Sequence, residues 1–394
     1  MPKFAPYIDV TREQEFNQLV QYKQRYGVKA FTLAFALGGT GGCDPMWGGQ
    51  QPIDDPKIIG PIMDLRAAGG DVIVATGGAM GPYLEGICGS VDALVTAYKK
   101  VLSVTGSTHI DVDVEASVPT DMMNRALASL QRENPEITVS FTLMVQGDDY
   151  GLTDILGVEV LKSAAKNGVN VDIVNPMTME FGTSRSSWGD AVISAAEATL
   201  RQMRGVWPQK SDPELYSMLG VTPMLGRNFN GKVFEIRHAK QLVEWALQKK
   251  IGFLAFWSIG RDKGCPGSGI SPSCSSIDQE DFEFTKIFVA FDDGRVEPDS
   301  DNEIIPPKPE TPQNTSPEEV TTTPQPTRLT TKKVNQAIDC SQSDKRHPHP
   351  NDCNKYIWCY NNEPHVMSCG PGTVWNSGND YCDYAQNANR PECL

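Results

Sequence analysis

The stretch His109–Ser117 reads HIDVDVEAS, in which apolar β-branched residues alternate with acids at a period of two. Successive side chains of a β-strand point to opposite faces, so this period places Asp111, Asp113 and Glu115 on one face, about 6–7 Å apart. The opposite face is apolar and can pack beneath helices. Burying unpaired carboxylates is unfavourable, so packing alone gives no reason for three acids on one face. The row therefore indicates a chemical role.

This stretch is the fourth of eight strand-like segments in residues 1–293, and amphipathic helical segments separate them. The segments are Phe4–Val10, Ala30–Leu37, Asp71–Thr76, His109–Ala116, Ile137–Met144, Val171–Met177, Met218–Met224 and Gly252–Ser258. Strands that are buried on both faces and separated by helices favour parallel βαβ units. Eight such units in about 290 residues predict an α/β fold, a (β/α)8 TIM barrel, rather than a doubly wound sheet.

Several helix ends are also readable. Thr11–Gln14 has the pattern of a capping box at the start of a first helix, which Gly27 would end. Ser90 is a candidate N-cap of a later helix, and Gly168 and Gly205 stand where glycine ends helices.

The acid row has the pattern of a general acid site. Crowded carboxylates cannot all ionise at low energy, so some of their pKa values rise and a proton is retained near neutral pH. Glu115 lies nearest the carboxyl end of its strand, where barrel active sites are found, and Asp113 and Asp111 follow more deeply. A calcium loop is disfavoured because Ala116 stands where such a loop needs glycine. A solvated polar face would fit an edge strand, which a closed barrel lacks.

Charge and hydropathy exclude two classes of partner. The 394 residues include 35 basic and 49 acidic ones, a net charge of −14, which disfavours binding to nucleic acid. No apolar run approaches the ~18 residues that span a bilayer, so we expect no membrane partner. Eight prolines, eight threonines and no aromatic residue lie between Glu297 and Lys333. We therefore expect residues 294–338 to be an extended, solvated linker.

Six of the ten cysteines crowd into residues 339–394. Such a cluster indicates a small module stapled by disulfides, and hence an oxidising compartment. Six cysteines allow fifteen pairings, among which spacing does not choose, and zinc is disfavoured because no Cys-x-x-Cys pair occurs. In the larger segment, proximity in the predicted topology suggests Cys43–Cys88 and Cys265–Cys274. Met1–Pro6 shows no leader peptide, so we expect a sequence from which the leader is missing.

Asp111-x-Asp113-x-Glu115 on a fourth strand resembles the signature of glycoside hydrolase family 18, the chitinases. The resemblance extends over residues 4–293. Thr76–Gly78 resembles the glycine-rich end of the third strand, Met177–Glu180 the sixth-strand motif, and Phe256–Ser258 the eighth-strand tryptophan. Cys43–Gly49 and Trp257–Asp262 are similar to the archaeal and bacterial branch of the family.

This resemblance implies a secreted, extracellular chitinase that acts on chitin and chito-oligosaccharides with retention of configuration, by substrate-assisted catalysis. Glu115 would protonate the glycosidic oxygen and then act as base. Asp113 would orient the substrate acetamide after swinging away from Asp111. The mechanism needs no metal or organic cofactor, and nothing in the sequence suggests an obligate oligomer, so we expect a monomer.

The resemblance also implies a set of sugar contacts. Trp257 would form a floor under the distorted sugar, unless it is a core tryptophan. Trp47 would be a stacking platform, unless it packs on a neighbouring loop. Gln146 and Asn228, at the ends of strands five and seven, would reach hydroxyls or the acetamide. The remaining contacts are Met179 and Glu180, which replace a tyrosine and an aspartate common in the family. These two replacements are expected to alter the rate of the reaction rather than its type. The alternative function is that of a chitin-binding lectin-like protein with weak or no turnover.

The C-terminal cysteine spacing, C-x12-C-x5-C-x9-C-x12-C-x10-C with interleaved aromatic residues, resembles the peritrophin-A chitin-binding module. The resemblance implies a β-rich module with the bridges Cys340–Cys359, Cys353–Cys393 and Cys369–Cys382. It also implies that aromatic residues contact chitin; the candidates are Tyr356, Trp358, Trp375 and Tyr384.

Overall fold

The computed structural model describes residues 2–265, 269–294, 340, 346–360, 363–369, 374–377 and 381–383. Apart from Gly294, the predicted linker lies outside these residues, as does Tyr384. The last helix of the larger unit ends at Asp293. In the described part of the chain, no helix is both long and apolar enough to cross a membrane.

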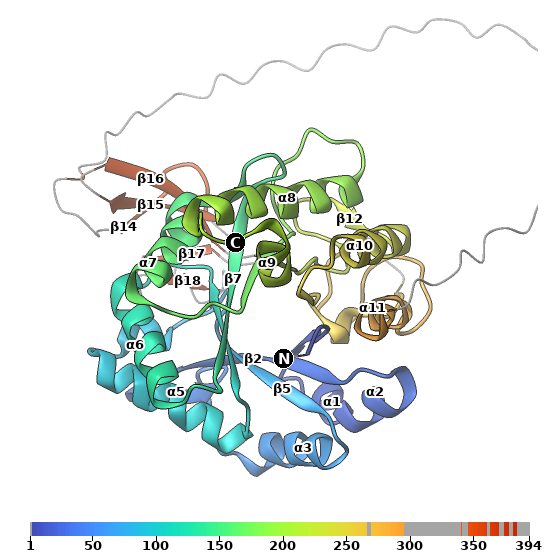
Figure 1. Cartoon of the computed structure of the whole chain (residues 1–394), viewed down its shortest axis with the longest axis horizontal. Coiled ribbons are helices and arrows are strands. Elements are labelled where there is room, and N and C mark those ends of the chain that lie inside the picture. The colour runs from blue at the N-terminus through green and yellow to red at the C-terminus, as the bar shows by residue number, and fades with distance from the viewer. Residues whose placement is uncertain are drawn as a thin grey trace, which may run out of the picture.

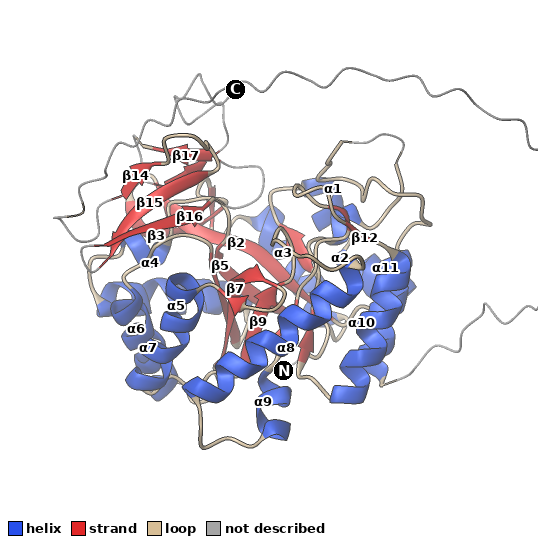
Figure 2. Ribbon diagram, turned by 90° about the horizontal axis from the view of Figure 1, so that it is seen from above, coloured by secondary structure: helices blue, strands red, loops and turns tan. Residues whose placement is uncertain are grey.

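Parallel strands occupy the centre of the larger unit (Figures 1 and 2), and each of the eight predicted segments overlaps one of them. They are β1 (Tyr7–Asp9), β2 (Ala30–Gly39), β5 (Asp71–Gly77), β6 (His109–Val114), β7 (Thr138–Gly147), β9 (Ile173–Met177), β10 (Gly220–Val221) and β13 (Phe253–Leu254). Parallel pairing runs through β1, β2, β5, β6, β7 and β9 in that order. β10 pairs with β13, and single parallel bridges join Val174 to Leu219 and Phe4 to Leu254.

Helices surround these strands (Figure 2). They are α1 (Glu13–Phe16), α2 (Leu19–Tyr26), α3 (Pro56–Ala67), α4 (Leu84–Ile87), α5 (Val91–Thr105), α6 (Thr120–Glu133), α7 (Glu159–Asn167), α8 (Trp188–Val206), α9 (Asp212–Met218), α10 (Ile236–Lys249) and α11 (Glu283–Asp293), with a π-helical turn η1 (Asp154–Val158) and a 3₁₀ turn η2 (Ile259–Arg261). Each long helix turns an apolar face inward; in α5 that face includes Leu94, Tyr98 and Val101. The strands are therefore covered by helices, as strands buried on both faces require.

The helix ends agree only in part with the sequence patterns. Gly27 and Gly168 end their helices in the left-handed conformation, and the Ser90 hydroxyl caps α5. The capping box was wrong, because the Thr11 hydroxyl and amide both bond the Asp9 carboxylate and the helix starts at Glu13 without a side-chain cap. Gly205 was also misread, since α8 continues through it.

Short antiparallel strands, which the sequence patterns did not reveal, extend the carboxyl ends of the parallel strands. They are β3 (Gly42–Trp47), β4 (Gln51–Pro52), β8 (Gly151–Leu152), β11 (Gly226–Arg227) and β12 (Val233–Phe234). β3 folds back on β2, and β8 folds back on β7. These hairpins extend the unit at the carboxyl ends of its parallel strands, which is the end where Glu115 lies.

The C-terminal module is built of antiparallel strands, as predicted. One sheet contains β14 (Arg346–Pro348), β15 (Lys355–Tyr360) and β16 (Glu363–Ser368), and a hairpin contains β17 (Val374–Asn376) and β18 (Tyr381–Asp383). The rings of Tyr356 and Trp375 stack at 4.1 Å and join the two.

Three predicted disulfides are confirmed: Cys43–Cys88, Cys265–Cys274 and Cys340–Cys359. Cys353 and Cys369 are disulfide-bonded as well. Their predicted pairings, Cys353–Cys393 and Cys369–Cys382, depend on partner side chains outside the described part of the molecule.

Candidate active site

Strand register places the acid row. β6 lies between β5 and β7, with Asp111 opposite Ser140 and Asp113 opposite Gly77. Gly77 has a φ of +83°, and a Cβ at this position would lie 2.0 Å from the Asp113 carbonyl oxygen. Only glycine lets the end of β5 pass this close to β6. The glycine of the Thr76–Gly78 motif thus allows the close approach of two backbones beside the acids.

Asp111 forms the buried end of the row. Its carboxylate accepts hydrogen bonds from the hydroxyls of Tyr7 (2.8 Å), Ser140 (2.5 Å) and Thr142 (3.0 Å). Burial raises the pKa of Asp111 to about 6, although these hydrogen bonds act in the opposite direction. Two of the donors come from the neighbouring strand β7, and Tyr7 comes from β1, which is not adjacent to β6 in the sheet.

Asp113 is buried one step nearer the mouth. Its Oδ1 atom accepts no hydrogen bond from the described residues. Burial, followed by the charges of Glu115 and Asp111, raises the pKa of the Asp113 carboxyl well above its usual value. A buried carboxyl oxygen without a partner is unfavourable, so Asp113 is poised to accept a hydrogen bond from a bound ligand.

Glu115 directly follows the last residue of β6 and lines a cleft of about 1560 Å³. Burial raises the pKa of its carboxyl to about 7. Its backbone N–H donates to the Tyr83 hydroxyl (3.2 Å), and that hydroxyl donates to the Gly78 carbonyl. Tyr83 therefore ties the acid to the glycine-rich end of β5. A carboxyl with this pKa holds its proton for a large fraction of the time near pH 7 and can act as a general acid.

Aromatic rings form the floor of the cleft. Trp257 is half-buried, lines the cleft, and stacks on Phe35 with ring centroids 5.9 Å apart. Tyr7, which also bonds Asp111, packs against Trp257 at 6.1 Å. The exposed part of Trp257 fits its predicted place beneath a sugar, and its buried part belongs to a core cluster.

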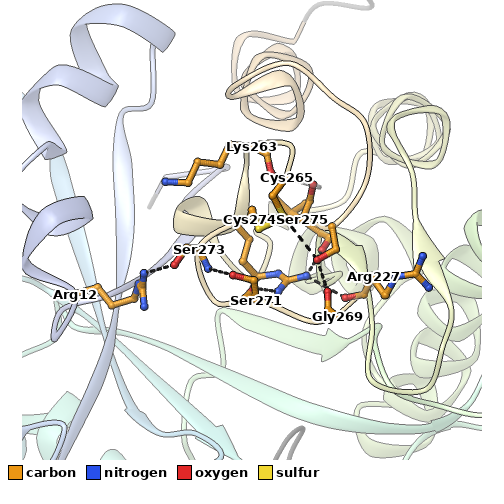
Figure 3. The surroundings of a disulfide bond; sticks show 12 residues. Arg12, Arg227, Lys263, Cys265, Gly269, Ser271, Ser273, Cys274 and Ser275 are labelled. Carbon is orange, nitrogen blue, oxygen red and sulfur yellow. Dashed lines mark hydrogen bonds between the residues drawn. A yellow bond between two sulfur atoms is a disulfide. The ribbon is translucent and has the colours of Figure 1, made fainter. Parts of the chain in front are cut away.

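The loop after β13 forms part of the rim. Ile270 and Pro272 line the cleft, and the Cys265–Cys274 disulfide closes the loop that carries them (Figure 3). Arg12 holds this loop from the first βα connection by a hydrogen bond to the Ser273 hydroxyl (2.6 Å). This part of the rim is therefore held by a disulfide within the loop and by a hydrogen bond to Arg12, near the N-terminus.

The predicted sugar contacts divide into two groups. Met179 and the exposed Gln146 line the cleft as expected. Trp47 is among the residues that line the cleft, but it is fully buried and its indole N–H donates to the Ile53 carbonyl (3.0 Å), so it packs within its loop and is no exposed platform. Asn228 is also a correction: it is buried, is not among the residues that line the cleft, and donates to the Met224 and Gly226 carbonyls.

Glu180 lies at the cleft but already has partners. Its two carboxylate oxygens accept hydrogen bonds from the backbone N–H groups of Phe229 and Asn230, both at 2.7 Å. Burial raises the pKa of the Glu180 carboxyl, and these two hydrogen bonds lower it in part. The expected sugar contact is therefore engaged with the loop that follows β11.

Part of the C-terminal module also lines the cleft, through Lys355, Pro364, Val366, Met367 and Cys369. The module aromatics predicted to contact chitin are placed differently from expectation. Tyr356, Trp358 and Trp375 are each less than a tenth exposed. The rings of Tyr356 and Trp375 stack on each other, and all three side chains belong to a buried cluster that also includes core residues of the larger unit.

Several residues of the site could not be found from sequence motifs. Tyr7, Thr142 and Tyr83 contact the acid row from other strands and loops, and Phe229 lies on the cleft rim. Register along the parallel strands was the one available signal for Thr142, which lies on β7 opposite Asp113 of β6. Nothing local in the sequence marks the other three.

Comparisons with known proteins identify the family of each unit. Residues 340–393 match the family model described as Chitin binding Peritrophin-A domain. A structure of catalytic-site mutants of active domain 2 of a thermostable chitinase from Pyrococcus furiosus, complexed with chito-oligosaccharides, is similar: 40% identity, TM-score 0.69, covering 73% of this chain and 93% of that chain. The chain therefore belongs to the chitinases of glycoside hydrolase family 18.

Two curated relatives are longer proteins. A probable bifunctional chitinase/lysozyme of Escherichia coli (strain K12) is 30% identical over 311 residues, which are 73% of this chain and 34% of that protein. Endochitinase 11 of Metarhizium anisopliae is 31% identical over 280 residues, which are 66% of this chain and 52% of that protein. The chain thus spans about a third and about half of these relatives.

Proposed function

We propose that this chain hydrolyses the β-1,4 bonds of chitin and chito-oligosaccharides with retention of configuration. The observation that carries the proposal is the pairing of two neighbouring carboxyls. The pKa of Glu115 at the cleft is raised to about 7, while Asp113 beside it has a buried oxygen that lacks a hydrogen-bond partner among the described residues. One group can donate a proton, and the other can accept a hydrogen bond from the substrate.

The proposed reaction has two steps. Glu115 first transfers its proton to the glycosidic oxygen. As the glycosidic bond breaks, the anomeric carbon is attacked by the acetamido carbonyl oxygen of the sugar that carries this carbon, and the other sugar leaves as an alcohol. Asp113 accepts a hydrogen bond from the acetamide N–H and stabilises the positive charge of the resulting oxazolinium ion. A water molecule then attacks the anomeric carbon, gives its proton to Glu115, and regenerates the acetamide with retained configuration.

Three further parts belong to this proposal. The strand ladder closes into a (β/α)8 barrel over residues 1–293, which is supported by the parallel contacts from β9 through β10 and β13 to the N-terminal strand. Residues 339–394 hold the enzyme on solid chitin at the end of the linker of residues 294–338. The protein is secreted and acts as a monomer; its disulfides support the location outside the cell.

Turnover of soluble chito-oligosaccharides tests the reaction. Glu115→Gln keeps the size of the side chain and removes its ability to donate a proton, so we expect kcat to fall by roughly 10²–10⁴. Equal rates in both proteins would contradict the role of Glu115. No turnover by the unaltered chain, together with oligosaccharide binding, would instead support a lectin-like protein.

A further inference from the structure

The carboxylate of Glu180 accepts hydrogen bonds from the backbone of the loop that follows β11. Glu180 follows β9 with a φ of +61°, a conformation that non-glycine residues rarely adopt. In this conformation each carboxylate oxygen accepts one backbone N–H, from Phe229 and from Asn230. Hydrogen bonds to an ionised carboxylate are stronger than those between neutral groups. An uncommon backbone conformation is thus combined with a two-point attachment to one short loop.

The same loop is held from other directions. The Asn230 side chain donates to the Phe181 carbonyl (3.1 Å), and the Asn228 N–H donates to the Lys232 carbonyl (2.8 Å). Arg261 donates to the carbonyls of Leu225 (2.8 Å) and Arg227 (3.0 Å) at the base of the loop. Arg227 lies close to the loop closed by Cys265 and Cys274 (Figure 3). The backbone around Phe229 is therefore fixed on both sides.

Phe229 itself is 48% exposed and lines the cleft. Burying a phenylalanine side chain is worth about 1.5–3 kcal/mol relative to leaving it exposed, so a rigid loop that keeps this ring in water forgoes that stabilisation. The large exposed hydrophobic residues among those described are Met63, Tyr150, Phe229 and Val366, and of these only Phe229 and Val366 line the cleft. A firmly held aromatic ring in the wall of a cleft offers an apolar face to a ligand in that cleft.

We propose that Phe229 stacks on the apolar face of a sugar ring of the bound chain, and that Glu180 is the positioning residue that holds Phe229 in place. This inference rests on the proposed function and deepens it, because it assigns a sugar contact to a residue outside the family motifs. Glu180 then acts on substrate binding through the loop, whereas Glu115 acts on the bond that breaks.

Affinity for a soluble chitin hexasaccharide tests the proposal, measured by calorimetry in the Glu115→Gln background so that no cleavage interferes. We expect Phe229→Ala to raise Kd roughly tenfold, which corresponds to about 1.4 kcal/mol. Phe229→Trp should restore binding, because it restores an aromatic face. Met63→Ala is the matched control: it removes an exposed apolar side chain on the outer helix α3 and should leave Kd unchanged.

A double-mutant cycle tests the role of Glu180. Glu180→Gln leaves one oxygen to accept one N–H, so it should raise Kd less than Phe229→Ala does. Added to Phe229→Ala it should change Kd no further, because residues that act through one contact are not additive. In active protein the same substitutions should raise KM and leave kcat unchanged.

Three results would overturn the inference. They are an unchanged Kd in a folded Phe229→Ala protein, a failure of Phe229→Trp to restore binding, and full additivity of the two substitutions. Because binding is measured without turnover, failure of the proposed hydrolysis is separate: it would appear as oligosaccharide binding without cleavage by the unaltered chain.

Discussion

The two units of this protein differ in the residues that they bury. The larger unit buries a row of acids beside a cleft, and the C-terminal module buries the aromatic residues that were expected to contact chitin. In the larger unit, helices and parallel strands supply a wide apolar core, and three acids occupy the inward face of one strand beside a cleft. In the C-terminal module, Tyr356, Trp358 and Trp375 are themselves buried. A large domain can hold polar groups for chemistry because its core does not depend on them, whereas a small module needs its aromatics for packing.

The largest effect expected in this comparison comes from Asp113→Asn. The substitution keeps the shape of the side chain but removes the charge that stabilises the oxazolinium ion. We expect kcat to fall by roughly 10²–10³ without a loss of thermal stability, because burial already disfavours the charged form of Asp113. Steady-state rates on chito-oligosaccharides give the answer. Asp64→Asn, on an exposed position of α3, is the control; a similar loss in both variants would remove the special role of the buried row.

Trp375→Ala addresses the module. Replacing a buried tryptophan by alanine destabilises a protein by about 3–5 kcal/mol, so we expect the module to unfold and adsorption to solid chitin to fall on the order of 100-fold. Limited proteolysis reports the folding of the module, and a pull-down on chitin reports adsorption. Trp375→Phe should preserve much of both. A protease-resistant module that no longer adsorbs would make Trp375 a ligand contact instead of a core residue.

The pH dependence follows from the proton on Glu115. Because the pKa of this carboxyl is raised to about 7, its protonated form, which is the competent acid, is lost as pH rises through that value. We expect kcat/KM to fall about tenfold per pH unit above about pH 7. Initial rates on a soluble oligosaccharide between about pH 5 and about pH 9 measure this profile. A flat alkaline side would contradict the assignment of Glu115.

The smallest effect concerns the backbone beside the row. Gly77→Ala would place a Cβ against the Asp113 carbonyl in a left-handed conformation, and we expect a loss of about 1–3 kcal/mol of stability. Thermal unfolding detects such a loss as a shift of a few degrees. Gly205→Ala is the matched control in helix α8, where no atom other than the helix's own nearby backbone lies within 4 Å of the added Cβ, and it should stabilise by about 0.5–1 kcal/mol. Equal melting temperatures of the Gly77→Ala protein and the unaltered chain would show that the close approach at Gly77 tolerates a side chain.

Periodic patterns explain which parts of the structure could be predicted. The eight strands and the acid row follow from local alternation, which depends on residues two positions apart. The partners of Asp111 do not, because Tyr7 and Thr142 reach it from strands distant in the chain. Position on a loop or at a strand end suggested that Trp47 and Asn228 contact the sugar. In the structure the indole N–H of Trp47 and the side-chain amide of Asn228 donate to backbone carbonyls.

Glu180 is a further residue whose partners could not be predicted from the sequence. Its residue type suggested a sugar contact, but its partners are backbone N–H groups of a loop after the next parallel strand. Side-chain chemistry can be read from sequence, while the group that a side chain meets is decided by tertiary packing.

The anomeric form of the first product tests the central claim most directly. Proton NMR during the first minutes of chito-oligosaccharide cleavage distinguishes the two anomers before they equilibrate. If Glu115 and Asp113 act with the substrate acetamide as described, the newly formed reducing end appears first as the β-anomer. Initial appearance of the α-anomer would mean direct attack by water and would contradict the account.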